Sequence, residues 1–169
     1  MITPNSFKDG MRRLAGAVSI IATGGASGID GKTITSCCSV TLEPPTLLVC
    51  LYEQTNFYSM LLKNGVFSIN ILSEQDQGVA HYFAKSQHGD VQEVLSSRPW
   101  KLHNGLPVCS TALTSFICTV EDILIKGTHA VVFGTVHDVH FSDSNDPLLY
   151  FYCNYTTLFN KHSSAVQIS

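Results

Sequence analysis

Two long β-type segments joined by a very short connection restrict the fold of this chain more than any other feature of its sequence. STALTSFICTVEDILIK, residues 110–126, partly alternates between apolar and polar positions, as an antiparallel strand with one solvated face does. GTH, residues 127–129, is expected to form a turn, and AVVFGTVHDVHF, residues 130–141, returns. We therefore expect an antiparallel sheet in which these two strands are direct neighbours.

The N-terminal half adds strands of the same kind. Apolar, β-branched segments occupy residues 17–23, 46–52 and 66–72, and Pro44 and Pro45 end the segment that precedes the second of them. The segment at the C-terminal end, PLLYFYCNY, is also expected to be a strand. Several strands at short spacing with few helices indicate a β-barrel, and they do not alternate regularly with helices as a parallel α/β sheet requires.

Start and stop signals predict only three helices. These run from Asn5 or Ser6 to Leu14, from a cap at Thr55 to Gly65, and from a cap at Ser73 to about Lys85. Residues 86–108 contain two glycines and two prolines and are expected to be loop-like. The sequence shows no internal repeat and no linker, so we expect one domain.

The composition excludes several classes of function. Charged residues make up 14% of the 169 residues, against about 25% in an average soluble domain. Much of the surface is therefore expected to lie against a partner subunit or a flat ligand. The net charge is −3 with no block of like charges, which argues against nucleic acid as a partner. No apolar run approaches the roughly 20 residues of a membrane helix, so no membrane association is expected. The six cysteines lack a zinc spacing and are expected to be reduced, mostly buried thiols of a cytoplasmic protein.

Two motifs in the sequence imitate functional signals. MRRLAGAVSIIATGGASG, from Met11, has the charge and apolar pattern of a signal peptide, but ten residues precede it and its apolar run is β-branched like a strand. ASGIDGKT, residues 26–33, fits a relaxed phosphate-loop pattern. That mechanism needs a helix to begin at Lys32 and Thr33, whereas the β-branched TITSCCSVTL that follows predicts a strand. The same glycines lack the G-x-G-x-x-G spacing of a dinucleotide-binding fold.

The segment TITSCCS has an excess of short polar side chains. On a regular strand, Thr33, Thr35, Cys37 and Ser39 would share one face. Such hydroxyls, together with exposed backbone N–H groups, suit the phosphate and ribityl chain of a flat cofactor, which can then lie against the backbone. The alternative is a strand with a hydroxyl-rich, solvated face, and the residues alone leave both open.

Six segments, in this order, resemble the short-chain flavin reductase family, the reductase components of two-component flavin monooxygenases such as 4-hydroxyphenylacetate 3-monooxygenase. They are GAVSIIAT, GKTITSCCSVTLEPPTLLVCL, NGVFSINILSEQ, VAHYFA, GTHAVVFGTV and PLLYFYCNY. The resemblance implies an antiparallel Greek-key split barrel that binds FMN, with a few short helices and a homodimeric assembly. It also implies a single domain over residues 1–169 with an ordered core at about 7–159.

The resemblance implies which residues contact the flavin. Those on the hydroxyl-rich segment would surround its ribityl-phosphate and ring edge, and others would come from the VAHYFA helix and the C-terminal strand. The implied cofactor-binding residues are Thr33, Thr35, Ser36, Cys37, Ser39, Val40, His81, Phe83 and Tyr155. His81 stands where relatives often carry arginine, and an exposed helix histidine remains the alternative. Relatives often have a basic residue near Tyr152–Cys153 that is missing here, which favours FMN over FAD.

GTH matches a turn that the family associates with the nicotinamide substrate, so Gly127, Thr128 and His129 are implied to contact NADH or NADPH. His129 is the expected catalytic residue, because hydride transfer needs alignment more than proton abstraction. His137 and His140 are expected to be ordinary strand residues, and no metal site is expected. Sequence spacing does not show which residues from other segments lie near these two histidines in the folded protein. Tyr150, Tyr152 and Tyr155 are placed to lie over the flavin or at the dimer seam, but Phe151 and two of these three tyrosines are expected to be core residues.

The resulting function is an NAD(P)H-dependent flavin reductase that takes a hydride from nicotinamide C4 at flavin N5 and supplies reduced FMN to a partner oxygenase. Two alternatives stay open at this point. One is a flavoprotein that reduces another acceptor, such as a corrinoid, and the other is a non-catalytic flavin- or haem-binding split barrel. The sequence does not decide between NADH and NADPH, or between flavin as prosthetic group and flavin as substrate.

Overall fold

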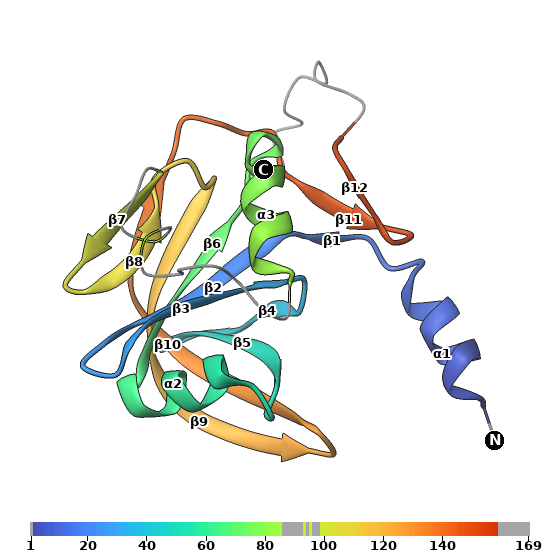
Figure 1. Ribbon diagram of the computed structural model, residues 1–169, viewed down its shortest axis with the longest axis horizontal. Helices are drawn as coiled ribbons and strands as arrows, with labels where there is room; N and C mark the ends of the chain where they lie inside the picture. Colours follow the sequence, from blue (N-terminus) through green and yellow to red (C-terminus); the bar gives the residue numbers. More distant parts are fainter. Residues whose placement is uncertain (1, 86–92, 94, 96–98, 159–169) are drawn as a thin grey trace.

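The computed structural model describes residues 2–85, 93, 95 and 99–158, and it is mainly β (Figure 1). The N-terminal elements are α1 (Pro4–Met11), β1 (Gly16–Ala17), β2 (Ser19–Gly25), β3 (Gly28–Ile34), β4 (Cys37–Leu42), β5 (Pro45–Tyr52), α2 (Asn56–Asn64) and β6 (Val66–Ile71). They are followed by a 3₁₀ turn (Glu74–Asp76), α3 (Gln77–Phe83), β7 (Trp100–His103), β8 (Leu106–Cys109), β9 (Thr114–Lys126), β10 (His129–Phe141), β11 (Leu149–Phe151) and β12 (Asn154–Thr156).

Seven strands form the main sheet, in the order β3-β2-β6-β9-β10-β5-β4, and every neighbouring pair is antiparallel. The first and last strands of this order, β3 and β4, are consecutive in the chain and are separated only by Thr35 and Ser36. The sheet must therefore curl until its two edges meet at this bend. No ladder joins β3 to β4 among the described residues, so the barrel is split, which confirms the predicted fold class.

The core consists of two apolar clusters that share β2. Ile21 packs inside the barrel with residues such as Phe67 and Val132, while Ile20 packs on the outside with Phe83 and other residues around α3. Residues 19–24 of β2 are all buried. Burial on both faces explains why this strand reads as a continuous apolar run, the pattern that imitates a signal peptide. Of the described residues, no helix has the length and apolar character needed to cross a membrane.

Helix α2 forms as its end signals predict. The hydroxyl of Thr55 accepts a hydrogen bond from the backbone N–H of Tyr58 at 3.2 Å, and Gly65 ends the helix in the left-handed conformation with φ 68°. The first helix differs from the expectation. Thr3 rather than Asn5 or Ser6 caps α1, because Pro4 suits the first helical turn, and the helix ends at Met11 before Leu14.

The third predicted helix is shorter than expected. The chain after Ser73 first makes the 3₁₀ turn, and α3 follows and ends at Phe83. The buried carboxylate of Asp76 accepts hydrogen bonds from the N–H and hydroxyl of Ser73 and from the hydroxyl of Thr111. These bonds hold the turn, because a buried carboxylate is costly without partners.

The expected loop between residues 86 and 108 is only partly described, and its described end is a hairpin. Strands β7 and β8 pair around a tight turn at Asn104 and Gly105, both with positive φ. The phosphate-loop motif is confirmed as a false match, since Lys32 and Thr33 lie inside strand β3 and no helix begins there.

We expect Gly134→Ala to destabilise the fold. A methyl group at this position in β10 would overlap the ring of Phe67, which is fully buried and cannot move away. Overpacking of this kind costs about 1–3 kcal/mol of unfolding free energy. Urea denaturation followed by fluorescence measures the loss.

Gly78→Ala is the matched control. Gly78 lies in helix α3 and has open space where a methyl group would sit. This substitution is expected to be neutral or to stabilise by up to about 1 kcal/mol, because alanine is the better helix former. Equal stability of the two variants would contradict the packing of Gly134 against Phe67.

Candidate flavin and nicotinamide site

The hydroxyl-rich segment is not the single regular strand that alternation predicted. It bends at Thr35 and Ser36, between the end of β3 and the start of β4, so the four residues Thr33, Thr35, Cys37 and Ser39 do not lie along one continuous strand. The hydroxyl of Ser36 donates to the carbonyl of Cys50 at 2.9 Å, and the N–H of Cys50 donates to the carbonyl of Ser36 at 3.2 Å. This pair of bonds fixes the bend, and we call residues 33–36 the hydroxyl bend.

A hollow of about 380 Å³ lies beside the hydroxyl bend. Its lining comes from three parts of the chain: residues 32–36, residues 50–52 of β5, and Thr55 with Phe57 at the start of α2. The volume lies within the usual range for small-molecule sites, about 300–1,000 Å³. Thr33, Thr35 and Ser36 are therefore brought together at one polar hollow.

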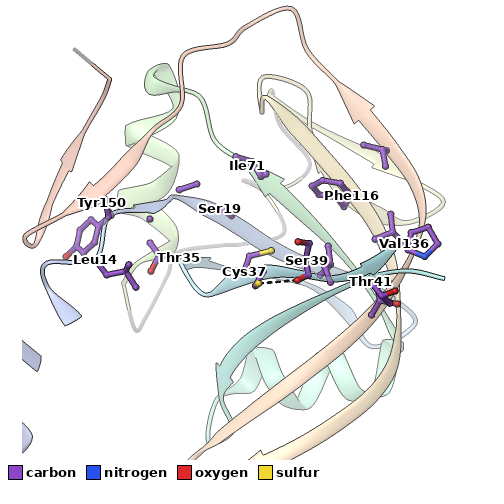
Figure 2. A pocket seen from close by; sticks show the side chains of 18 of the residues that line it. Leu14, Ser19, Thr35, Cys37, Ser39, Thr41, Ile71, Phe116, Val136 and Tyr150 are labelled. Carbon is purple, nitrogen blue, oxygen red and sulfur yellow. Dashed lines mark hydrogen bonds between the residues drawn. The ribbon is translucent and has the colours of Figure 1, made fainter. Parts of the chain in front are cut away.

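A second, larger hollow of about 890 Å³ begins at the same bend (Figure 2). Cys37 and Ser39 of β4 line it together with Thr35, which lines both hollows. Most of its remaining walls are apolar, including Ile71, Phe116, Val136 and Tyr150 (Figure 2). Val40 is exposed and lines neither of these two hollows.

The turn before β10 places His129 next to the smaller hollow. Gly127 has a φ of 62°, which favours glycine, and the carbonyl of Thr128 accepts a hydrogen bond from the N–H of Glu53 at 3.2 Å. His129 pairs with Tyr52 across the two strands, and their ring centroids are 5.5 Å apart. Tyr52 lines the smaller hollow, so the imidazole lies beside one of its lining residues, although His129 itself does not line the hollow.

One nitrogen of the His129 imidazole contacts the neighbouring residue, Thr128. The ring Nδ1 lies 3.0 Å from the hydroxyl of Thr128, within hydrogen-bond distance. This contact leaves Nε2 as the ring nitrogen available to a bound ligand. The residue is exposed, so a ligand can reach it.

A hydrogen bond connects the hydroxyl bend to the backbone of helix α3. The hydroxyl of Thr33 donates to the carbonyl of Ala80 at 2.7 Å. The next residue, His81, packs edge-to-face on Tyr155 with 4.7 Å between ring centroids, and Tyr155 contacts Tyr150 at 5.4 Å. Burial, and secondarily Tyr150, raises the pKa of the Tyr155 hydroxyl, which keeps it a neutral hydrogen-bonding group.

The predicted contact between Phe83 and a flavin needs correction. Phe83 is fully buried and packs edge-to-face on Trp100 at a centroid distance of 5.7 Å, with Gly31 closely opposed to its ring. The helix turns this side chain into the core, and a ligand at the surface cannot reach it. Its role is to anchor α3 against the sheet.

The six cysteines are all free, as expected, but their burial varies. Cys109 and Cys118 are buried, whereas Cys38 and Cys153 are exposed. Burial, with a smaller contribution from Cys38, raises the pKa of the Cys37 thiol to about 11. Cys37 is therefore a neutral thiol near pH 7, which does not suit a nucleophile.

Seven lining residues of the smaller hollow were not predicted as site residues from the sequence, among them Lys32, Cys50 and Tyr52. In the sequence, Lys32 belongs only to the false phosphate-loop motif. In the structure, its ammonium lies near the C-terminal end of α3, 3.3 Å from the carbonyl of Lys85. Cys50 and Tyr52 lie in an apolar strand without a polar signature. Only the pairing of β5 with β4 and β10 brings them to the site.

Comparisons with known proteins agree with this geometry. Over 150 residues the chain is 37% identical to an FMN reductase (NADH), RutF, from Stutzerimonas stutzeri, covering 88% of this chain and 85% of the relative. The crystal structure of BorF, the flavin reductase component of a bacterial two-component tryptophan halogenase, is 25% identical, with a TM-score of 0.87 over 92% of this chain and 98% of its own.

A more distant structure shows the same fold. The flavin reductase of styrene monooxygenase from Pseudomonas putida is 23% identical, with a TM-score of 0.81 over 90% of this chain and 97% of its own. Residues 11–158, nearly all of the described part, match the flavin reductase like domain. The chain therefore belongs to the flavin reductase family of oxidoreductases.

Proposed function

We propose that this protein is an NADH-dependent FMN reductase whose flavin lies in the smaller hollow against the hydroxyl bend. One observation carries this proposal: the turn at residues 127–129 holds the ring of His129 beside that of Tyr52, which lines the hollow. A site that only binds flavin does not need an imidazole beside it. The names of relatives such as the Stutzerimonas stutzeri FMN reductase (NADH) support the choice of both FMN and NADH.

The residues of the smaller hollow fit a flavin. Thr35 is exposed and no described protein group accepts a bond from its hydroxyl, so this hydroxyl is available to the ribityl chain or ring edge. The hydroxyls of Thr33 and Ser36 are already engaged with backbone carbonyls, so these two residues shape the bend and present its backbone. Backbone dipoles near the polar edge of the ring would favour the anionic reduced flavin.

Two basic side chains are candidates to contact the phosphate group. Lys32 lines the hollow, and His81 lies on helix α3, which Thr33 ties to the bend. One lysine and one histidine suit a single phosphate better than the pyrophosphate of FAD. The described residues Tyr152 and Cys153 add no basic group, which again favours FMN, with FAD as the alternative.

A flavin held in this hollow would supply the electron-accepting chemistry, as acceptor of the hydride that nicotinamide C4 gives to N5. The chain itself positions the reactants. The 3.0 Å contact with Thr128 and the packing on Tyr52 restrict the orientation of the His129 ring. A fixed imidazole beside the hollow can hold the nicotinamide over the flavin, and such alignment accounts for much of the rate when no proton must be abstracted.

A homodimer completes the proposal. Helix α1 projects away from the body (Figure 1) and buries none of its own residues. Eight residues are too few for a stable isolated helix in water. Its residues Lys8 and Met11 line the larger, mainly apolar hollow, and Leu42, which is exposed, lines the same hollow. A second copy covering this region would bury these groups.

The proposal also includes the fate of the reduced flavin and the cellular location of the enzyme. The reduced flavin would diffuse to a partner oxygenase, and the enzyme would work in the cytoplasm, where its six free thiols remain reduced. Reduction of a different acceptor, such as a corrinoid, would use the same flavin site.

Changing Thr35 to Val should weaken FMN binding while preserving the fold. Loss of one neutral hydrogen bond costs about 0.5–1.5 kcal/mol, which raises the Kd about 2- to 13-fold. Fluorescence titration of FMN measures this change. Ser39→Val is the informative companion, because Ser39 lines only the larger hollow. Weaker FMN binding in Thr35→Val alone would support the smaller hollow as the flavin site. Weaker binding in both variants would assign the flavin to the larger hollow. Unchanged binding in both variants would refute both locations.

His129→Ala should spare FMN binding and damage hydride transfer. A misplacement of about 1 Å can cost on the order of 10²-fold in rate when a reaction depends on near-attack geometry. Stopped-flow reduction of FMN-loaded protein by NADH measures this step, and His137→Ala, an exposed histidine of the same strand, is the matched control. A normal reduction rate in His129→Ala would remove the assigned role. FMN binding without NADH oxidation by the wild-type protein would instead indicate a non-catalytic flavin-binding module.

Light scattering at micromolar concentration should show twice the 18.4 kDa chain mass. Obligate dimers bury more than about 2,000 Å² of surface, so one charge in the interface should shift the equilibrium toward the monomer. Leu42→Arg places such a charge on a side chain that is 85% exposed in the single chain. Leu62→Arg, at an exposed leucine of α2, is the control and should leave the mass unchanged. A wild-type mass of 18.4 kDa alone would exclude the dimer.

A further inference from the structure

We propose that His103, Asp138 and His140 form a binding site for a divalent transition-metal ion such as Zn²⁺, separate from the flavin site. One nitrogen of each histidine and one carboxylate oxygen all lie within 4.8 Å of one another. The sequence predicted no metal site, because no carboxylate has a recognisable metal-binding spacing with His137 and His140. The fold changes this conclusion by adding His103, which is 35 residues away from Asp138 in the chain.

An irregularity in β10 places two of the three ligands. The register between β10 and β9 shifts between Val136 and Asp138, so His137 is left without a ladder partner. After the shift, Asp138 pairs with Ile117 and His140 with Ser115. Alternate residues of a strand share a face, so Asp138 and His140 project together. Their side chains approach closely, with 3.5 Å between His140 Nε2 and an Asp138 carboxylate oxygen.

The β7–β8 hairpin brings the third ligand. His103 is the last residue of β7, next to the tight turn at Asn104 and Gly105. Its ring lies edge-to-face against that of His140, with 5.3 Å between centroids. Both histidines also line a hollow of about 340 Å³, so an ion between them can be reached from solvent.

These separations fit one ion after small side-chain movements. Zinc binds histidine nitrogen at about 2.0–2.1 Å and carboxylate oxygen at about 2.0–2.2 Å, so tetrahedral ligand atoms lie about 3.3–3.5 Å apart. The His140–Asp138 pair already has this separation. The other separations need to shorten by about 1 Å or a little more, which partly exposed side chains can do: those of His140 and Asp138 are 45% and 50% exposed.

The donor set indicates the kind of metal. Imidazole suits Zn²⁺, Ni²⁺, Cu²⁺ and Co²⁺, whereas Mg²⁺ and Ca²⁺ prefer sites made of oxygen atoms. Three protein ligands leave at least one coordination position for water. The bound ion would cross-link the β7–β8 hairpin to β10, two parts of the fold that share no strand pairing among the described residues.

The test uses tag-free full-length protein, treated with chelator, dialysed and titrated with Co²⁺ while its visible spectrum is recorded. We expect saturation at one Co²⁺ per chain, displacement of the colour by Zn²⁺, and no thiolate charge-transfer band. Zn²⁺ should also raise the melting temperature, because the ion binds the folded chain. His103→Ala and His140→Ala should each weaken binding at least about tenfold, while both variants keep the wild-type circular dichroism spectrum.

His137→Ala is the matched control and should bind the metal as the wild type does. Wild-type affinity in both His103→Ala and His140→Ala would overturn the proposal, as would loss of binding in His137→Ala alone. A thiolate charge-transfer band would place the ion on cysteine and would also overturn it. The readouts do not depend on flavin or NADH, so the result is independent of the proposed function.

Discussion

Two hydrogen bonds between Ser36 and Cys50 stabilise the bend between β3 and β4, and the arrangement of the other strands depends on this bend. These bonds fix a two-residue bend between strands that are neighbours in the chain but opposite edges of the seven-stranded sheet. If residues 28–42 continued as one straight strand, the sheet would have no reason to curl. The bend therefore gives the barrel its curvature, and it leaves a split where β3 and β4 are not paired.

The proposed flavin site depends on the same bend. Regular pairing would engage the backbone groups of residues 35 and 36 in a ladder, whereas the bend leaves part of this backbone at the surface beside short side chains. The bond from Thr33 to Ala80 brings helix α3 to one side, and the pairing of β5 with β10 brings Tyr52 and His129 to the other. Three distant parts of the sequence thus meet at a position set by the curvature of the sheet.

Features determined by local chemistry could be predicted from the sequence. Thr55 and Gly65 bound α2 because capping depends on a few neighbouring residues, and the β-branched residues after Lys32 excluded a phosphate-binding helix. The order of six motifs predicted the flavin reductase family, and the comparisons confirm it. The expected mainly β split barrel is likewise confirmed. The roles given to individual site residues stay predictions, apart from the correction at Phe83.

Features determined by strand pairing could not be predicted in this way. Nothing near Cys50 or Tyr52 in the sequence indicates a ligand site, because their position depends on which strands lie on either side of β5. Phe83 was misplaced because the family resemblance indicates that its helix lies near the flavin but does not show that the Phe83 side chain faces Trp100. The bend at Thr35 was missed because alternation of side chains assumes a strand that continues.

Thr35 lines both hollows, so a single side chain forms part of the wall between the proposed ligand site and the apolar region that a second copy would cover. A substitution at this position would therefore affect both the proposed flavin contact and the proposed subunit interface. A bulkier residue that improves contact with one flavin would also reshape the surface offered to the other subunit. Residue 35 is therefore expected to vary only together with its neighbours across the subunit boundary, and cofactor preference and assembly would evolve as linked traits.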